Sequence, residues 1–303
     1  MTGDYKNLSD GLPADVELST SALLWEVRRR LVADEAVPLA GNIAFRMVFS
    51  AFPFLIFLTS LAGFFGSEAW AESAVNFLLG VAPKNLVAPL AGEIRYLLTV
   101  PRSDLLSIGA LLTVWSAMAG VDSVRVGLNR AYDVKDERPL WLLYGLSVLF
   151  VVGTAFLLLA LALLIVLFPV AVKLLNSFAG GIPVSLIQLD YWRFPLAIFL
   201  LLIGVLTAHR FLPAKTMTLR AIYPGVILTV IGWIIMSSGF SYWLVNFNSF
   251  SSTYASLSGI FAAMFFVYLA ALLLIAGGEL NRVLELLRLK RSLTRRRKND
   301  TGE

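Results

Sequence analysis

The feature that most constrains this chain is a run of 58 residues, 221–278, without a single charged side chain. Soluble domains keep about a quarter of their residues charged, so that every surface element can be solvated. A helix that crosses the hydrocarbon core of a bilayer, about 30 Å thick, needs about 20 mainly apolar residues. The run is long enough for two such passes, with the polar, uncharged stretch 246–258 as the turn between them. We therefore predict an integral membrane protein.

Other windows of low charge complete the pattern and predict an all-α fold, a bundle of six transmembrane helices. The composition agrees, with 58% hydrophobic and 15% charged residues. The third span is longer than the hydrocarbon core is thick, so it must tilt or project beyond it. The six spans are expected at about 45–67, 104–121, 140–170, 194–209, 222–245 and 257–278.

Lysine and arginine are distributed unequally between the two sides that six spans define. Of the 25 such residues, 19 fall in the N-terminal segment, the loops after the second and fourth spans, and the C-terminal tail. The positive-inside rule then places both termini in the cytoplasm. We expect a disordered cytoplasmic N-terminus at 1–20, a membrane domain at 21–285 and a basic cytoplasmic tail at 286–303. No cleavable signal peptide is expected, because the first apolar run begins only near residue 42.

Two amphipathic segments are predicted to flank the bundle. Residues 21–32 should form an interfacial helix on the cytoplasmic side, and residues 83–100 an interfacial or re-entrant helix on the opposite side. Their apolar stripes are Leu23, Leu24, Val27 and Leu31 in the first, and Leu86, Leu90, Ile94 and Leu97 in the second.

The first span carries three residues of interest. Arg46 is a candidate functional residue, because a charge inside a membrane helix is costly, although near the end of the span it can also snorkel to water. Pro53 cannot donate to the Phe49 carbonyl and is predicted to kink the helix, and the Ser50 hydroxyl can help to satisfy the freed groups.

Polar residues also gather where the second and sixth spans reach the cytoplasmic side. We hypothesise that Glu279 or Asp122 pairs with Arg46 and that the set borders a cavity open to the cytoplasm. The alternative is a structural collar of ion pairs that holds helix ends together. The remaining members of the set are Arg125, Asn129 and Asn281.

Small residues recur at regular spacing in the last two spans, with Gly225, Gly232 and Gly239 seven apart and Gly259 opening the sixth. Such residues let helices approach closely, so helix packing is favoured over a substrate path. The loop 132–138 clusters three carboxylates, but interleaved lysine and arginine favour a solvated loop over a metal site.

Several kinds of chemistry are poorly supported. The chain has no cysteine and one histidine, His209, so no cofactor, no metal centre and no enzymatic activity are predicted. The central part of the membrane region lacks an acidic residue, so a proton- or sodium-coupled relay is not expected. The basic tail is expected to contact anionic lipid head groups or to set topology, and no specific nucleic acid is expected.

Short motifs occur in order along most of the chain. They are AF at 44–45 with SAFP at 50–53, LNRAY at 128–132 with RPLW at 138–141, RFLP at 210–213 with PG at 224–225, YASLSG at 254–259, and GGELN at 277–281. Together they resemble the YihY/BrkB family of bacterial inner-membrane proteins, once called ribonuclease BN. The resemblance implies a six-helix inner-membrane bundle with cytoplasmic termini and links to transport and virulence. Arg46 departs from the family pattern, in which aromatic or small residues are usual there.

Two functions follow as hypotheses. The first is a transporter or exporter of a lipid or amphipathic solute, supported by the kinked first span, the over-long third span and the polar set on the cytoplasmic side. The second is a non-transporting scaffold that contributes to envelope integrity, with a second copy of the chain or another envelope protein as its partner. Ribonuclease activity is not expected, because RNA hydrolysis needs a metal cluster or a poised acid and base.

Overall fold

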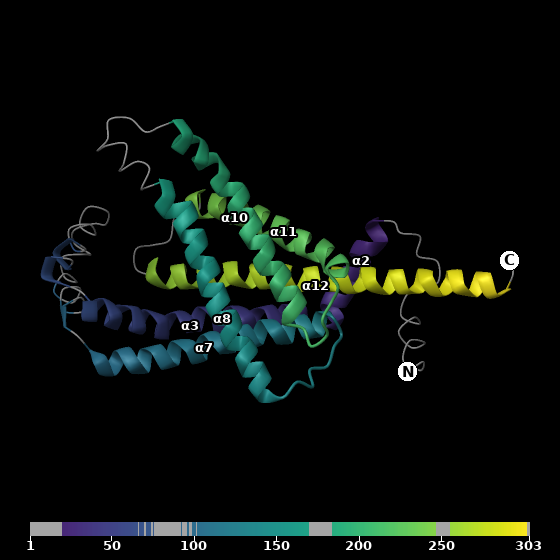
Figure 1. The fold of residues 1–303 in the computed structure, drawn as a ribbon, viewed down its shortest axis with the longest axis horizontal. Coiled ribbons are helices and arrows are strands. Elements are labelled where there is room, and N and C mark those ends of the chain that lie inside the picture. The colour runs from purple at the N-terminus through teal and green to yellow at the C-terminus, as the bar shows by residue number, and fades with distance from the viewer. Residues whose placement is uncertain are drawn as a thin grey trace. The chain divides into compact units, whose positions relative to one another are not determined.

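In the computed structural model, residues 20–65, 102–169, 184–246 and 255–301 are described, with a few residues between 67 and 100. These four ranges contain helices and no strand. The predictions for residues 1–19 and for most of 83–100 lie outside the described residues. The helices are α2 (Thr20–Ala33), α3 (Ala36–Phe65), α7 (Ser103–Ala131), α8 (Leu140–Ala162) with the π-helical turn η2 (Leu163–Leu167), α10 (Val184–Phe211), α11 (Leu219–Asn246) and α12 (Ala255–Thr301) (Figure 1).

Six helices in the described part of the chain are long and apolar enough to cross a membrane, which confirms the predicted number. Three of them extend well beyond the predicted bounds. The first apolar segment begins at Ala36, the second continues to Ala131 and the last continues to Ser292. Helix α12 has 47 residues and is therefore about 70 Å long. It continues through the basic tail as far as Thr301 instead of ending where the charges begin.

The chain divides into two compact units. The larger contains residues 1–44 and 122–303, and the smaller contains residues 45–121. The boundaries fall inside α3 and α7, so each of these helices contributes to both units.

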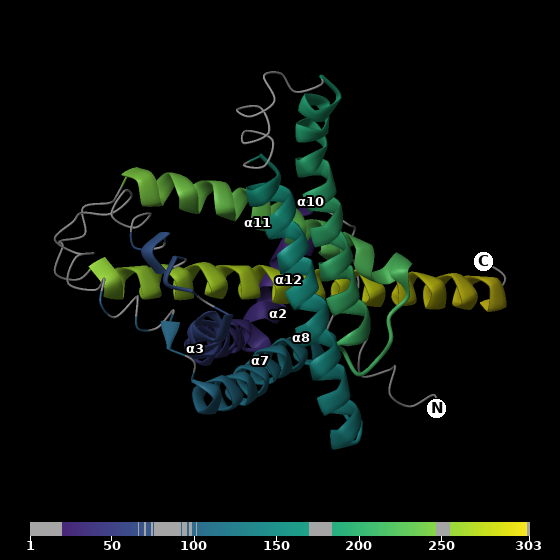
Figure 2. The same cartoon turned by 60° about the vertical axis from the view of Figure 1, so that its left-hand side comes forward.

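In the larger unit, α11 packs against α12, and α10 packs against α11 (Figures 1 and 2). The approach of α11 to α12 depends on glycine. A Cβ atom at Gly225 would collide with the carbonyl oxygen of Gly277, and one at Gly277 would meet the Gly225 carbonyl oxygen at 2.6 Å. Because the obstacle is backbone on both sides, neither position has room for a side chain.

The four glycines predicted to mediate helix packing are close-packed only in part. At Gly232 a Cβ atom would lie 2.9 Å from Leu273 of α12. At Gly239 and Gly259 no such neighbour lies within 4 Å among the described residues. The backbones of α11 and α12 therefore approach each other most closely in the first half of α11. Near the middle of α11, the indole of Trp233 donates to the Ala270 carbonyl at 2.9 Å.

Helix α2 packs across the later part of α12 (Figures 1 and 2). Its Val27 is buried against Val283 and Leu287 of α12, with Leu23 and Leu31 beside them. The amphipathic helix predicted at 21–32 is present, but most of its apolar stripe is covered by α12 and only Leu24, 64% exposed, is left out.

Helix α8 begins directly after Pro139, which stands at its N-cap, and it is apolar around its whole circumference. The over-long third span ends differently from a plain helix, because the π-helical turn η2 follows Ala162. A π-helical turn widens the helix by one residue and is often found at functional sites. Helix α8 meets α10 where Leu157 lies over Gly204.

In the smaller unit, the parts of α3 and α7 that belong to it run antiparallel. Arg46 lies beside Ala119 and Phe57 beside Gly109, where a Cβ atom would be 3.1 Å from the Phe57 backbone. Helix α3 is continuous through Pro53. The Ser50 hydroxyl does not serve the carbonyl freed by that proline, because it donates to the Met47 carbonyl oxygen at 2.7 Å.

Candidate functional site

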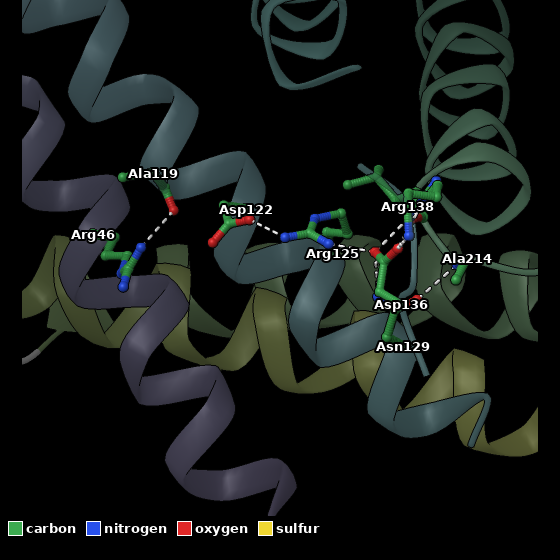
Figure 3. A network of polar contacts seen from close by, with 9 residues as sticks. Arg46, Ala119, Asp122, Arg125, Asn129, Asp136, Arg138 and Ala214 are labelled. Atoms are coloured by element: carbon green, nitrogen blue, oxygen red, sulfur yellow. Dashed lines mark hydrogen bonds and ion pairs between the residues drawn. The ribbon is translucent and has the colours of Figure 1, made fainter. Parts of the chain in front are cut away.

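A polar cluster of the larger unit gathers around the Asp136 carboxylate, in the loop between α7 and α8 (Figure 3). Arg138 donates from Nε at 2.9 Å and from Nη2 at 2.8 Å, and the Asn129 amide donates at 3.1 Å. Arg125 bridges Asp136 to Asp122. We call Asp122, Arg125, Asn129, Asp136 and Arg138 the Asp136 cluster.

The local fold explains why these residues meet. Arg125 and Asn129 are one turn apart on α7, so they share a face. The chain reverses after α7 at Asp133, whose φ of 53° is a left-handed conformation that aspartate tolerates. The Val134 amide then donates to the Asn129 carbonyl at 2.9 Å, which closes the turn. This reversal brings Asp136 back along the side of α7.

The Asp136 cluster also fixes the end of α10. Arg138 donates to the Leu212 carbonyl at 2.7 Å, and the Asn129 side-chain oxygen accepts from the Ala214 amide at 2.8 Å. Hydrogen bonds from Arg138, and then from Arg125 and Asn129, hold the pKa of the Asp136 carboxyl well below its usual range. With every charge paired, the cluster is suited to holding helix ends together.

A second network lies deeper, among α7, α10, α11 and α12. The Asn281 amide donates to the Tyr132 hydroxyl at 2.9 Å, and that hydroxyl lies 2.8 Å from Nδ1 of His209. The Asn281 oxygen accepts from the Gly225 amide at 2.7 Å. The Tyr132 hydroxyl accepts from Asn281, and its bond to His209 is donated by Tyr132 or by Nδ1 according to whether the histidine proton lies on Nε2 or on Nδ1. That Nε2 is buried and meets no partner among the described residues.

Glu279 lies on α12, two residues before Asn281, and its side chain is fully buried. No donor among the described residues reaches either carboxyl oxygen. Its electrostatic neighbours are Asp34 and Arg30, at the end of α2, and Asp133, after α7. The sequence pattern places Glu279 at the exit of the last span, where solvent is expected, so its complete burial is an unexpected result.

The predicted set of polar residues therefore separates into groups. Asp122, Arg125 and Asn129 belong to the Asp136 cluster, and Asn281 belongs to the deeper network. Arg46, Ser50 and Pro53 lie in the smaller unit, where Arg46 donates to the Ala119 carbonyl at 3.2 Å (Figure 3). The pairing of Arg46 with Glu279 or Asp122, and the cavity that it would border, stay predictions.

Five residues were not predicted from the sequence as parts of a site, and His209 among them was named only as the one histidine: Asp34, Asp136, Arg138, Tyr132 and His209. The loop 132–138 was expected to be solvated, yet the Asp136 side chain is only 12% exposed. The motif segments 128–132 and 138–141 contain Asn129, Tyr132 and Arg138, and in retrospect they mark the ends of this loop. Across the described residues, no group of three or more histidine, cysteine, aspartate or glutamate side chains could hold a metal ion.

Comparisons with known proteins show which proteins this chain is similar to. A ribonuclease-like protein YfkH of Bacillus subtilis is 30% identical over 270 residues, covering 87% of this chain and 95% of the relative. A UPF0761 membrane protein of Xanthomonas axonopodis pv. citri is 24% identical over 271 residues, and the match covers 87% of this chain. A UPF0761 membrane protein of Xanthomonas oryzae pv. oryzae is equally similar, and the chain matches 60% of the length of each Xanthomonas protein.

No solved structure matches this chain. The model of the family described as virulence factor BrkB matches residues 27–301, nearly the whole of the chain. Together with the six apolar helices, this match makes the chain a multi-pass membrane protein that belongs to the virulence factor BrkB family.

Proposed function

We propose that this protein moves a lipid or an amphipathic solute across the bacterial inner membrane, with both termini in the cytoplasm. The observation that carries the proposal is the position of Arg46 in α3, within an apolar segment that can cross the membrane. An ionisable residue in such a segment is costly and is usually kept for a purpose. Arg46 is half-buried and donates to a backbone carbonyl of α7, so its side chain is held within the helix pair.

Apolar rings flank this arginine on the same helix. Phe45, Phe49 and Phe52 are each more than half exposed. The rings of Phe45 and Phe49 are 5.9 Å apart, and those of Phe49 and Phe52 are 6.2 Å apart. A guanidinium beside an aromatic strip suits an amphiphile, since the cation can bind an anionic head group while the rings line an acyl chain. An anionic phospholipid or a similar amphiphile is therefore the expected substrate class.

The test is movement of a fluorescent phosphatidylglycerol analogue between the leaflets of proteoliposomes, followed by chemical quenching of the outer leaflet. Arg46→Gln is expected to slow movement about tenfold, the loss expected for one charge-assisted contact. The matched control is Arg28→Gln, which removes the same charge from an exposed position on α2. If the lipid analogue moves at the same rate with wild type, with Arg46→Gln and in empty liposomes, the proposal is wrong.

A non-transporting scaffold is the second candidate, and the length of α12 favours it. The helix continues past the last apolar segment, which ends at Ser292, to Thr301. That extension contains Arg295, Arg296, Arg297 and Lys298 and can contact anionic head groups or an acidic partner. If the protein is a scaffold, lipid should move no faster in proteoliposomes than in empty liposomes. Deletion of the extension should then change which proteins co-purify.

We infer no ribonuclease role from the name of the Bacillus relative. Acid–base hydrolysis of RNA needs a group that can exchange protons with a bound substrate. His209 is fully buried and its Nδ1 is bonded to Tyr132, so it is poorly placed for that role.

A further inference from the structure

Arg288 of α12 reaches the first turn of α11 and replaces a hydrogen bond that a proline removes. In an α-helix the Arg220 carbonyl would accept from the amide of residue 224, but that residue is Pro224, which has no N–H. The Nη1 atom of Arg288 donates to this carbonyl oxygen instead, at 3.0 Å. A contact between segments 68 residues apart in the chain therefore places the Arg288 guanidinium against the backbone of Arg220.

Both arginines are exposed, and neither meets a carboxylate in the part of the chain that the structure describes. The nearby acidic residue on α12 is Glu285, whose carboxylate pairs with Lys215 at 3.4 Å and with Arg282 at 3.1 Å. Arg288 uses one N–H group on the Arg220 carbonyl, and a guanidinium has five. The start of α11 therefore carries two cations with free donors, which suit the oxygens of a phosphate group.

Exposed tyrosines mark the depth of this end of α11. Tyr223 is 51% exposed and Tyr242 is 70% exposed. They are about 28 Å apart along the helix, at 1.5 Å per residue. That distance matches the hydrocarbon core of a bilayer, about 30 Å thick, and exposed aromatic rings gather at its two surfaces. Arg220 precedes Tyr223 by about 5 Å along the axis, so it lies in the head-group layer on the side of the loop between α10 and α11.

The face of α11 that carries Arg220 continues into the hydrocarbon core as an apolar stripe. Tyr223, Ile227 and Ile231, which we call the α11 stripe, follow Arg220 at helical spacing and are all exposed. Helix α12 covers another face of α11, at Gly225. A phospholipid has a phosphate at head-group depth and an acyl chain below it, so it matches the arginines and the stripe together. A free phosphate ion would leave the stripe uncovered.

We propose that Arg220 and Arg288 form a binding site for the phosphate group of an anionic phospholipid, whose acyl chain lies along the α11 stripe. The lipid belongs to the leaflet at the loop between α10 and α11, and it joins the start of α11 to α12 as a bound partner. The site does not rest on the proposed transport function. Arg46 belongs to the smaller unit, whereas every residue of this site belongs to the larger one.

The first test is native mass spectrometry of the full chain, reconstituted in vesicles of equal parts phosphatidylglycerol and phosphatidylethanolamine and released in a mild detergent. We expect wild type to retain phosphatidylglycerol in preference, and Arg220→Gln to lower that preference about tenfold, as the loss of one charge-assisted contact predicts. Arg28→Gln is the matched control, since it removes the same charge from an exposed position on α2, and it should behave as wild type. The same preference in all three proteins would overturn the proposal.

Arg288→Gln is the second variant, and it separates lipid binding from the support of the helix. It should lower the preference for phosphatidylglycerol as Arg220→Gln does, but it also removes the donor to the Arg220 carbonyl and can lower stability. The Arg220 side chain makes no hydrogen bond or ion pair among the described residues, so Arg220→Gln should fold as wild type. Lower stability of Arg288→Gln with an unchanged lipid preference in both variants would mean that Arg288 only caps the helix, and the site would be wrong.

The position of the lipid can be tested with one fluorescent label. Because the chain has no cysteine, Ile227→Cys provides a single point of attachment on the α11 stripe. Dibrominated phosphatidylglycerol should quench the label more than dibrominated phosphatidylethanolamine does, and adding Arg220→Gln should abolish the difference. Equal quenching by both lipids without Arg220→Gln would overturn the site. An excess of inorganic phosphate should not change the quenching, and loss of the difference on its addition would show that the arginines bind free phosphate instead of a lipid.

Discussion

Asp136 and Glu279 are two carboxyls of the same unit with opposite surroundings. Asp136 lies in a loop near the surface and accepts hydrogen bonds from Arg125, Arg138 and Asn129. Glu279 lies inside a helix, is fully buried and has no donor among the described residues. A carboxylate saturated with donors stabilises the fold, whereas a buried carboxyl without donors costs stability and needs another reason to be there. This contrast separates a cluster that holds helix ends together from a buried carboxyl that makes no such bonds among the described residues.

The largest expected effect is at Asp136. Asp136→Asn removes the charge shared by two arginines that are largely buried, Arg125 and Arg138, and turns an amide toward them. Breaking such a pair from one side should lower the free energy of unfolding by about 3 kcal/mol. Thermal unfolding in detergent measures the loss. Glu137→Gln, at the exposed neighbouring residue, is the control and should change stability by less than about 0.5 kcal/mol.

The same carboxylate predicts a dependence on pH. Because the folded-state pKa of Asp136 is lowered, mainly by Arg138, its stabilisation is present above the ordinary aspartate pKa of about 4. It is lost as pH falls through the lower folded-state value. The difference in stability between wild type and Asp136→Asn should therefore be constant above pH about 5 and should narrow in acid. A difference that stayed constant down to low pH would show that the charge of Asp136 is not what stabilises the cluster.

The next effect concerns the packing that fixes α12 beside α11, on the helix that carries Glu279. Gly225→Ala places a methyl group against the Gly277 carbonyl and the Asn281 side chain. Because the backbone cannot move aside, the free energy of unfolding should fall by about 1–3 kcal/mol. Gly239→Ala is the control on the same helix, where nothing lies within 4 Å, and it should be neutral or stabilising. Equal effects at both positions would mean that α12 is free to shift and that the burial of Glu279 is not fixed by packing.

The contrast also shows what could be predicted from the sequence. The six helices follow from windows of low charge, because each spanning segment must itself be long and apolar enough to cross the bilayer, whatever the rest of the chain does. That Arg125 and Asn129 share a face of α7 follows from their spacing of four residues for the same reason, since helical spacing is a local property.

The surroundings of the two carboxyls could not be predicted in that way. Lys135 and Arg138 around Asp136 indicate a solvated loop, and only the left-handed turn at Asp133 folds the loop back onto α7. The position of Glu279 just after an apolar run indicates an exposed helix end. Its burial depends on α2, whose Val27 packs against α12 one turn further on, at Val283. Both outcomes depend on contacts between segments far apart in the chain.

The smallest expected effect is at Glu279, and it is the sharpest test of the contrast. A glutamine has nearly the shape of a neutral glutamic acid, so Glu279→Gln should change the free energy of unfolding at neutral pH by less than about 1 kcal/mol. If Glu279 were an ionised partner of Arg30, the same change would leave a buried charge unpaired and cost about 3 kcal/mol, as at Asp136. Thermal unfolding of the two variants side by side distinguishes these cases. A small loss at Glu279 beside a large one at Asp136 would mean that the carboxyl buried in α12 makes no ion pair that stabilises the fold.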